Sequence, residues 1–148
     1  MHVRTSVAML VAVIVAGAGI LAGAQGGQKA APKKARVFFV EPKNGATVPA
    51  TVRLKFGSEG IEIAAVPPGE LTKTRPGVGH YHVGIDQDCL KPPTTIVKGT
   101  PAWVHFGDGK SEIDMQLTPG THKLALQIGD DLHNTMPDLC ESITVTVR

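Results

Sequence analysis

The sequence predicts an all-β domain, an immunoglobulin-like antiparallel β-sandwich of about seven strands. Apolar and polar residues alternate with period two in several short runs, and helical periodicity is absent. Turn-forming residues separate these runs. The segment that carries them, residues 37–148, is 112 residues long, which is the size of one domain.

The first strands are expected in the N-terminal half of this segment. Val37–Glu41 is followed by Pro42-Lys43-Asn44-Gly45, a turn sequence that ends the strand. Val52–Phe56 alternates apolar residues with Arg53 and Lys55. Gly79–Asp86 alternates again, with its apolar residues at every second position. One face of each run is apolar and the other polar, as expected for a sheet packed on one side.

The C-terminal half contains four more runs. Gly107-Asp108-Gly109 separates two of them and predicts a β-hairpin. The four expected strands are Trp103–Phe106, Ser111–Leu117, Lys123–Ile128 and Ile143–Val147.

Two long connections, residues 66–78 and 87–100, flank the strand Gly79–Asp86 and are rich in proline. Long loops in a compact domain are usually functional or disordered. Their position therefore directs attention to that strand.

The first 24 residues have the three parts of a secretory signal peptide. His2 and Arg4 form a short basic region, Ser6–Leu21 is almost wholly apolar, and Ala22-Gly23-Ala24 suits a signal peptidase. We expect cleavage before Gln25 and a periplasmic or secreted protein. The alternative is an uncleaved membrane anchor, since the segment is just long enough to span a bilayer.

Residues 25–36 have no hydrophobic period and are expected to form a disordered basic linker. The whole chain has 15 basic and 13 acidic residues, and five of the basic ones lie before residue 37. The expected domain, residues 37–148, therefore has 10 basic and 13 acidic residues and a formal charge of about −3. This balance argues against nucleic acid as a partner. Membrane association would come only from an uncleaved signal or weakly from the basic linker.

Cys89 and Cys140 are the only cysteines. An even number in an exported chain favours one disulfide, and the spacing is unlike a Cys-x-x-Cys metal or redox pair. A simple sandwich places the two residues at opposite ends of their strands. The bond therefore requires one of the long loops to fold back along the sheet.

Two histidines share one face of the strand Gly79–Asp86. Tyr81, Val83 and Ile85 form its apolar set, so His80 and His82 face the other way. Residues two apart on a strand are about 6.6 Å apart, and their imidazoles can reach one metal ion. A plain polar face gives the same pattern, so this spacing alone leaves both readings open.

The expected topology brings further ligands toward this pair. Antiparallel pairing of the third and sixth strands places Asp130, Asp131 and His133 near His80, and His105 joins if its strand packs nearby. Three histidines with an aspartate would form a divalent-cation site, with zinc or copper as the candidate ions. Met136 would favour copper. The alternatives are a solvated His133, a backbone-bonded His105, and turn-forming aspartates.

His122 follows Pro119-Gly120 and shares a face with Leu124 and Leu126. Polar aromatic residues at such a corner of a sandwich hydrogen-bond to the backbone. We therefore expect a structural role for His122.

The blocks GHYHVGID, HFGDGKSEIDMQLTPGTHKLALQIGDDLH and ITVTV resemble a bacterial exported family known as domain of unknown function 4399. The upstream stretch EPKNGATVPATVRLKFGSEGIEIAAVPPGE fits as well, so the resemblance covers nearly all of residues 37–148. It implies export and this fold, and it brings no established activity.

No complete catalytic motif is found in the sequence. Ser58, Ser111 and Ser142 lie outside any Gly-x-Ser-x-Gly elbow, and there is no His-Glu-x-x-His helix or phosphate-binding glycine loop. We therefore expect a non-enzymatic binding domain with a metal ion or small polar ligand at the histidines. A structural or adaptor module that contacts an envelope protein ranks second, and a metal-assisted hydrolase third.

Overall fold

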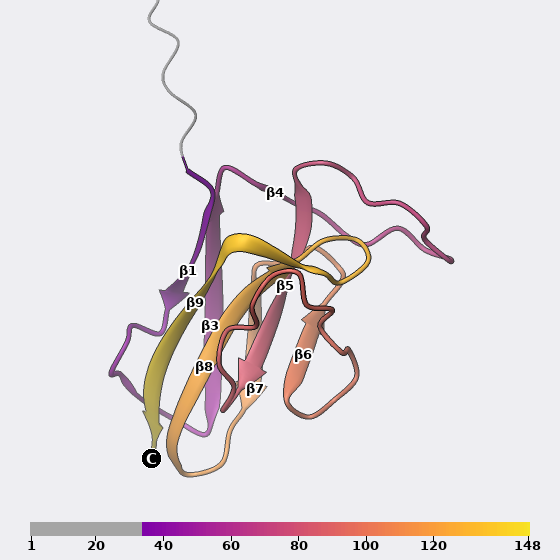
Figure 1. The fold of residues 1–148 in the computed structure, drawn as a ribbon. Coiled ribbons are helices and arrows are strands. Elements are labelled where there is room, and N and C mark those ends of the chain that lie inside the picture. Colours follow the sequence, from indigo (N-terminus) through magenta and orange to yellow (C-terminus); the bar gives the residue numbers. More distant parts are fainter. Residues whose placement is uncertain (1–33) are drawn as a thin grey trace, which may run out of the picture. The chain divides into compact units, whose positions relative to one another are not determined.

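A computed structural model of the protein describes residues 34–148, in which all regular structure is β (Figure 1). The expected signal peptide, residues 1–24, and most of the expected linker, residues 25–36, lie outside the described residues. Arg36 already belongs to the first strand, where its guanidinium pairs with Glu59 at 2.7 Å. Within residues 34–148 no helix is long and apolar enough to cross a membrane.

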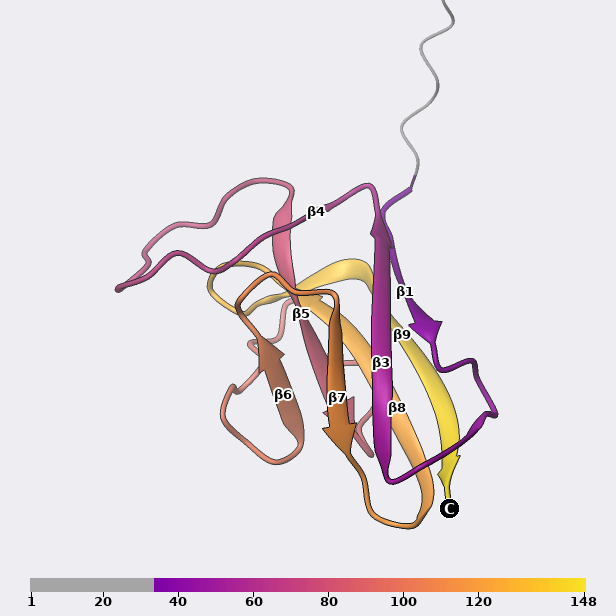
Figure 2. The same cartoon turned by 180° about the vertical axis from the view of Figure 1, so that it is seen from behind.

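One layer of the domain is a three-stranded antiparallel sheet in the order β1-β3-β7. Its strands are β1 (Arg36–Glu41), β3 (Thr51–Glu59) and β7 (Glu112–Gln116). Figure 2 shows β3 and β7 side by side in front of the second layer. The alternation in β3 turns Val52, Leu54 and Phe56 into the domain and Arg53 outward.

The second layer is built around the antiparallel strands β9 (Thr135–Val147), β8 (Gly120–Gly129) and β5 (Val78–Ile85). Three short strands complete it. β2 (Thr47–Val48) and β4 (Glu62–Ile63) pair parallel with β9 and β5, and β6 (Trp103–Phe106) pairs antiparallel with β5. The expected all-β sandwich is therefore confirmed, with two brief parallel pairs added to it.

The hydrophobic core lies between the two sheets. Leu54 from the first sheet and Val83, Leu124 and Leu126 from the second have no exposed surface. Phe56 crosses the core, with its ring centroid 5.2 Å from that of Tyr81 and 5.5 Å from that of Phe106. Each such side chain contributes about 1.5–3 kcal/mol when fully buried. Since Tyr81 and Val83 point into this core, the neighbouring residues of β5 point away from it.

The prediction of a hairpin at Gly107-Asp108-Gly109 is wrong. β6 pairs with β5, whereas β7 pairs with β3, so this turn carries the chain from one sheet to the other. Gly109 adopts a φ of 76°, and a Cβ there would lie 2.8 Å from the backbone nitrogen of Ala65. The tight glycine turn thus permits a close approach to a neighbouring loop rather than a hairpin.

Residues 87–102, here named the cover loop, fold back over the outer face of β8 and β9. Gln127 on β8 exchanges two hydrogen bonds with the backbone of Leu90, at 2.9 and 2.8 Å. Further along, the backbone nitrogen of Ile96 donates to the carbonyl of His133 at 2.8 Å. Ile96 and Trp103 pack on Ala125 to form a second, smaller core beneath the loop.

The expected disulfide joins Cys89 of the cover loop to Cys140, 51 positions along the chain. Two features make the bond possible. The cover loop returns along the sheet, and β9 begins at Thr135, eight residues before the strand expected at Ile143. Cys140 therefore lies within β9, paired with Gln127 of β8, rather than at the entry of the last strand.

Candidate metal centre

The site begins on the outer face of β5, where His80 and His82 point away from the core. The strand register places His105 of β6 directly beside His82, and Gly129 of β8 beside His80. Tyr81 and Val83 fix this arrangement, because a strand that buries them in the core must turn its even-numbered neighbours outward.

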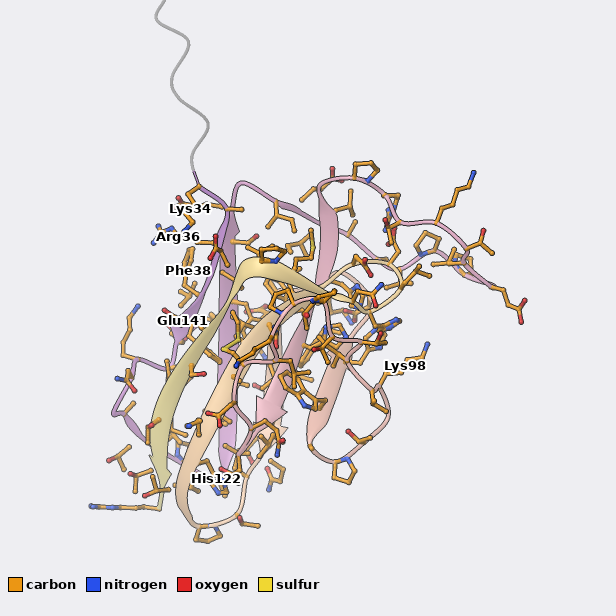
Figure 3. The ribbon with its side chains drawn as sticks, in the orientation of Figure 1. Lys34, Arg36, Phe38, Lys98, His122 and Glu141 are labelled. Atoms are coloured by element: carbon orange, nitrogen blue, oxygen red, sulfur yellow. A yellow bond between two sulfur atoms is a disulfide. The ribbon has the colours of Figure 1, made fainter. Side chains whose placement is uncertain are left out.

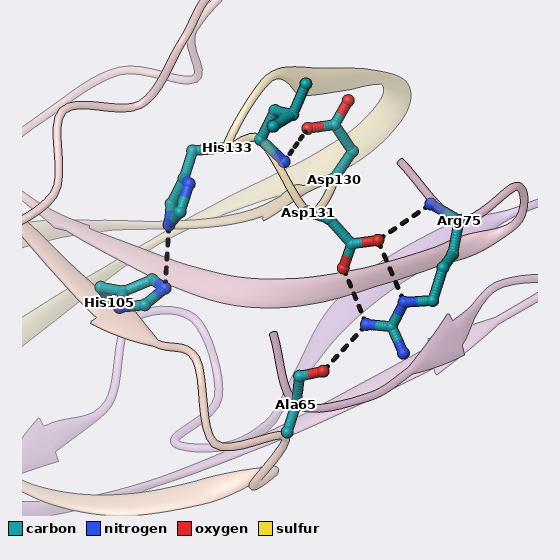
Figure 4. A network of polar contacts seen from close by, with 7 residues as sticks. Ala65, Arg75, His105, Asp130, Asp131 and His133 are labelled. Atoms are coloured by element: carbon teal, nitrogen blue, oxygen red, sulfur yellow. Dashed lines mark hydrogen bonds and ion pairs between the residues drawn. The ribbon is translucent and has the colours of Figure 1, made fainter. Parts of the chain in front are cut away.

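His133 reaches the same place from the turn between β8 and β9. Asp130 organises this turn, since its Oδ1 atom accepts hydrogen bonds from the backbone nitrogens of Leu132 and Asn134, both at 2.9 Å. His133 itself adopts a φ of 66°, an uncommon conformation for a residue other than glycine. Figure 4 shows its ring directed at His105.

The four imidazoles converge closely. One ring nitrogen from each of His80, His82, His105 and His133 lies within 4.8 Å of the others. The Nε2 atoms of His105 and His133 are 3.1 Å apart, and the ring centroids of His80 and His82 are 4.5 Å apart. Two nitrogens bound to one tetrahedral zinc ion lie about 3.3 Å apart, from metal–nitrogen distances of about 2.0–2.1 Å. The most separated nitrogens must therefore approach each other by up to about 1.5 Å, from 4.8 to about 3.3 Å, to bind one ion.

The two histidines of β5 are buried without polar partners. His80 and His82 have no exposed surface, and neither ring nitrogen of either residue has a hydrogen-bond partner in the described part of the chain. An unsatisfied buried polar group costs about 1–3 kcal/mol. A metal ion bound between the rings would give one nitrogen of each a partner.

All four rings favour the neutral form that metal binding requires. Burial, followed by the charges of the other histidines, lowers the pKa of His80 to about 3 and that of His82 to about 2. Burial also lowers the pKa of His105 and of His133, which are closer to the surface. The cluster is therefore a set of four neutral nitrogen donors at neutral pH.

Two glycines make room for the rings. A Cβ at Gly129 would lie 2.8 Å from Cε1 of His82, and one at Gly107 would lie 2.3 Å from Cε1 of His105. Real Cβ atoms essentially never approach that closely. The backbone at both positions therefore fits closely against the histidine cluster.

The other expected site residues are not part of the cluster, although Asp130 lies in the turn that carries His133. Asp130 is used in its own turn, and Met136 packs against the main core. His122 donates from Nε2 to the carbonyl of Thr118 and from Nδ1 to Asp86, both at 2.9 Å, at a corner visible in Figure 3. The hydrogen bond to Asp86 is the main reason that the pKa of His122 is raised.

Sequence reasoning brought Asp131 toward the cluster but missed its partner Arg75 and the nearby Lys98. The buried carboxylate of Asp131 accepts two hydrogen bonds from the guanidinium of Arg75, at 2.7 and 3.0 Å, and a third from its backbone nitrogen (Figure 4). A cavity of about 180 Å³ lies beside His133 and is also lined by Asp131 and Lys98. Arg75 and Lys98 both come from the long loops whose paths no periodicity predicts.

The fold and the site together define a β-sandwich domain with a candidate metal centre on the outer face of one sheet. The chain belongs to the family described as Domain of unknown function (DUF4399), whose family model matches residues 54–148. This match confirms the resemblance seen in the sequence. The matched segment contains all four histidines of the cluster. A search of curated proteins gives no match.

Proposed function

We propose that this protein is an exported domain that binds one transition-metal ion, zinc or copper, through His80, His82, His105 and His133. The observation that carries the proposal is the pair His80 and His82, buried together without any other polar partner in the described residues. Structural histidines are normally hydrogen-bonded when buried, and even the partly exposed His122 is hydrogen-bonded through both ring nitrogens.

The donor set indicates the class of ion. Imidazole nitrogens suit zinc and copper, whereas calcium and magnesium prefer oxygen ligands. The spacing of the rings also favours an ion over an organic ligand. Adjacent ring centroids are 4.5–5.6 Å apart, which leaves no space for a molecule between them.

The disulfide supports the exported setting of the proposal. Such bonds persist in oxidising compartments and are rare in the cytosol. The bond between Cys89 and Cys140 is the expected consequence of an exported chain. Binding of the ion rather than catalysis is proposed, since the four histidines supply four ligands to it and the sequence contains no complete catalytic motif.

The test is a titration of purified, chelator-stripped protein with Zn²⁺ and with Cu²⁺, followed by calorimetry and by elemental analysis after desalting. We expect one ion per chain, a dissociation constant below 1 μM as an order of magnitude, and a raised melting temperature. Electron paramagnetic resonance of the copper form should show coupling to several nitrogen nuclei.

The variants His80→Ala and His82→Ala together, and His105→Ala alone, should lose stoichiometric binding. His122→Gln is the matched control, because it removes a histidine outside the cluster, and it should bind normally. Circular dichroism establishes that each variant is folded. A folded wild-type protein that binds neither ion would overturn the proposal and favour an adaptor role.

A further inference from the structure

The proposed centre has no anionic ligand. Its four donors are neutral imidazoles, so a divalent ion bound there would bring a formal charge of +2 into a mostly buried site. A charge in such a site is costly unless it is paired. The site therefore requires a negative charge that the four histidines do not supply.

The two aspartates next to the cluster are engaged elsewhere. Asp131 is held by Arg75 through three hydrogen bonds, and that ion pair is already neutral as a unit. The Oδ1 atom of Asp130 accepts two hydrogen bonds from the backbone of the turn that carries His133. Neither carboxylate is free to bind an ion among the histidines without breaking the structure around it.

The surface beside the cluster carries a cation instead. Lys98 of the cover loop lines the same cavity of about 180 Å³ as His133, and Figure 3 shows it on the cover loop beside β6. A solvent-accessible space thus lies between an exposed ammonium group and one of the ligands.

We propose that the metal ion in the histidine cluster takes a small inorganic anion or carboxylate as an additional ligand, bound in the cavity between His133 and Lys98. This inference rests on the proposed function. The anion would balance the charge of the ion, and the ammonium group of Lys98 would attract it into the cavity. The cavity of about 180 Å³ is smaller than the sites that bind drug-sized ligands, which favours a small anion.

The test uses the protein loaded with Cu²⁺, the divalent ion that imidazole sites bind most tightly, and azide as the probe. Azide should produce a saturable charge-transfer absorption band and change the electron paramagnetic resonance spectrum. In Lys98→Met the azide dissociation constant should rise roughly three- to tenfold, as expected for the loss of one nearby charge. The same variant should bind Cu²⁺ more tightly, because a like charge has been removed.

Weaker azide binding together with tighter Cu²⁺ binding in Lys98→Met distinguishes the inference from a general weakening of the site. Lys98→Arg keeps the charge and should bind azide as the wild type does. Lys91→Met is the matched control, because Lys91 is an exposed lysine of the cover loop that lies beside the disulfide. If neither Cu²⁺ nor Zn²⁺ binds, the proposed function itself fails. If Cu²⁺ binds but azide does not, or if Lys98→Met binds azide normally, only the anion site is overturned.

Discussion

The Nε2 atoms of His105 and His133 lie 3.1 Å apart, although one residue belongs to β6 and the other to the turn before β9. Without a metal ion, one ring donates a hydrogen bond to the other at this distance. With an ion bound, both nitrogens would be unprotonated and would direct their lone pairs at the ion. The same geometry thus serves either state, so binding should require little rearrangement of these two residues.

Replacing His82 by leucine should stabilise the metal-free protein. Both ring nitrogens of His82 are buried without a partner in the described residues, and an apolar side chain of similar size removes that cost of about 1–3 kcal/mol. Chemical denaturation in the presence of chelator measures the change. The same variant should lose metal binding, and a variant that is destabilised in chelator would contradict our account of this side chain.

Gly129→Ala should weaken both stability and metal binding. Its Cβ would lie 2.8 Å from Cε1 of His82, and overpacking of this kind costs about 1–3 kcal/mol. The double variant Gly129→Ala with His82→Ala lacks the imidazole that the new Cβ would contact. Most of the destabilisation caused by Gly129→Ala should therefore disappear in this background. Thermal melts of the single and double variants give the coupling energy. Additive effects would show that the clash lies elsewhere.

Reduction of the disulfide should lower both stability and metal affinity. The bond closes a loop across 51 positions, and such a constraint is worth about 4 kcal/mol. It also anchors the cover loop, whose Ile96 nitrogen holds the backbone of His133. Metal titrations with and without a non-chelating reductant provide the measurement. Equal affinity in the two states would mean that the cover loop holds its position without the bond.

The metal-free protein should lose stability below pH 6.5. His80 and His82 have pKa values of about 3 and 2 in the folded protein and an ordinary value of 6.5, which the unfolded chain recovers. Above pH 6.5 both states are neutral and no penalty arises. Between pH 6.5 and about 3 the unfolded chain binds protons that the folded protein does not. Over this range each histidine lowers the free energy of unfolding by about 1.4 kcal/mol for each pH unit. Denaturation curves from pH 7.5 to 4.5 measure this slope.

His82→Leu again supplies the control, because it removes one of the two histidines with the largest pKa shifts and should flatten this pH dependence. Wild-type stability that stays constant over the same range would contradict the proton linkage.

The sequence predicted the sandwich and the centre of the site because both depend on alternation. In β5 the apolar residues Tyr81 and Val83 determine which way His80 and His82 face, and the pattern is visible in the sequence. The pairing of β5 with β8 then follows from the order of strands in a sandwich. It brings the turn with His133 to the correct end of β5.

The remaining features depend on loops, whose conformations carry no period. The role of Asp130 is decided by local hydrogen bonds in a turn, where a short carboxylate caps nearby backbone nitrogens more readily than it reaches an ion. The turn at Gly107-Asp108-Gly109 has hairpin residues, but strand pairing across the two sheets decides its path. Lys98 lies beside the cluster only because the cover loop folds back.

The four histidines of the cluster come from one strand, a second strand and a turn that span residues 80 to 133. An unfolded chain presents only the His80-Tyr81-His82 pair, which is a weak chelate. The complete site arises when β5, β6 and the β8–β9 turn have come together. A chain that crosses a membrane unfolded would therefore not bind an ion tightly before it crosses. The ion in the folded site would then come from the compartment in which the chain folds.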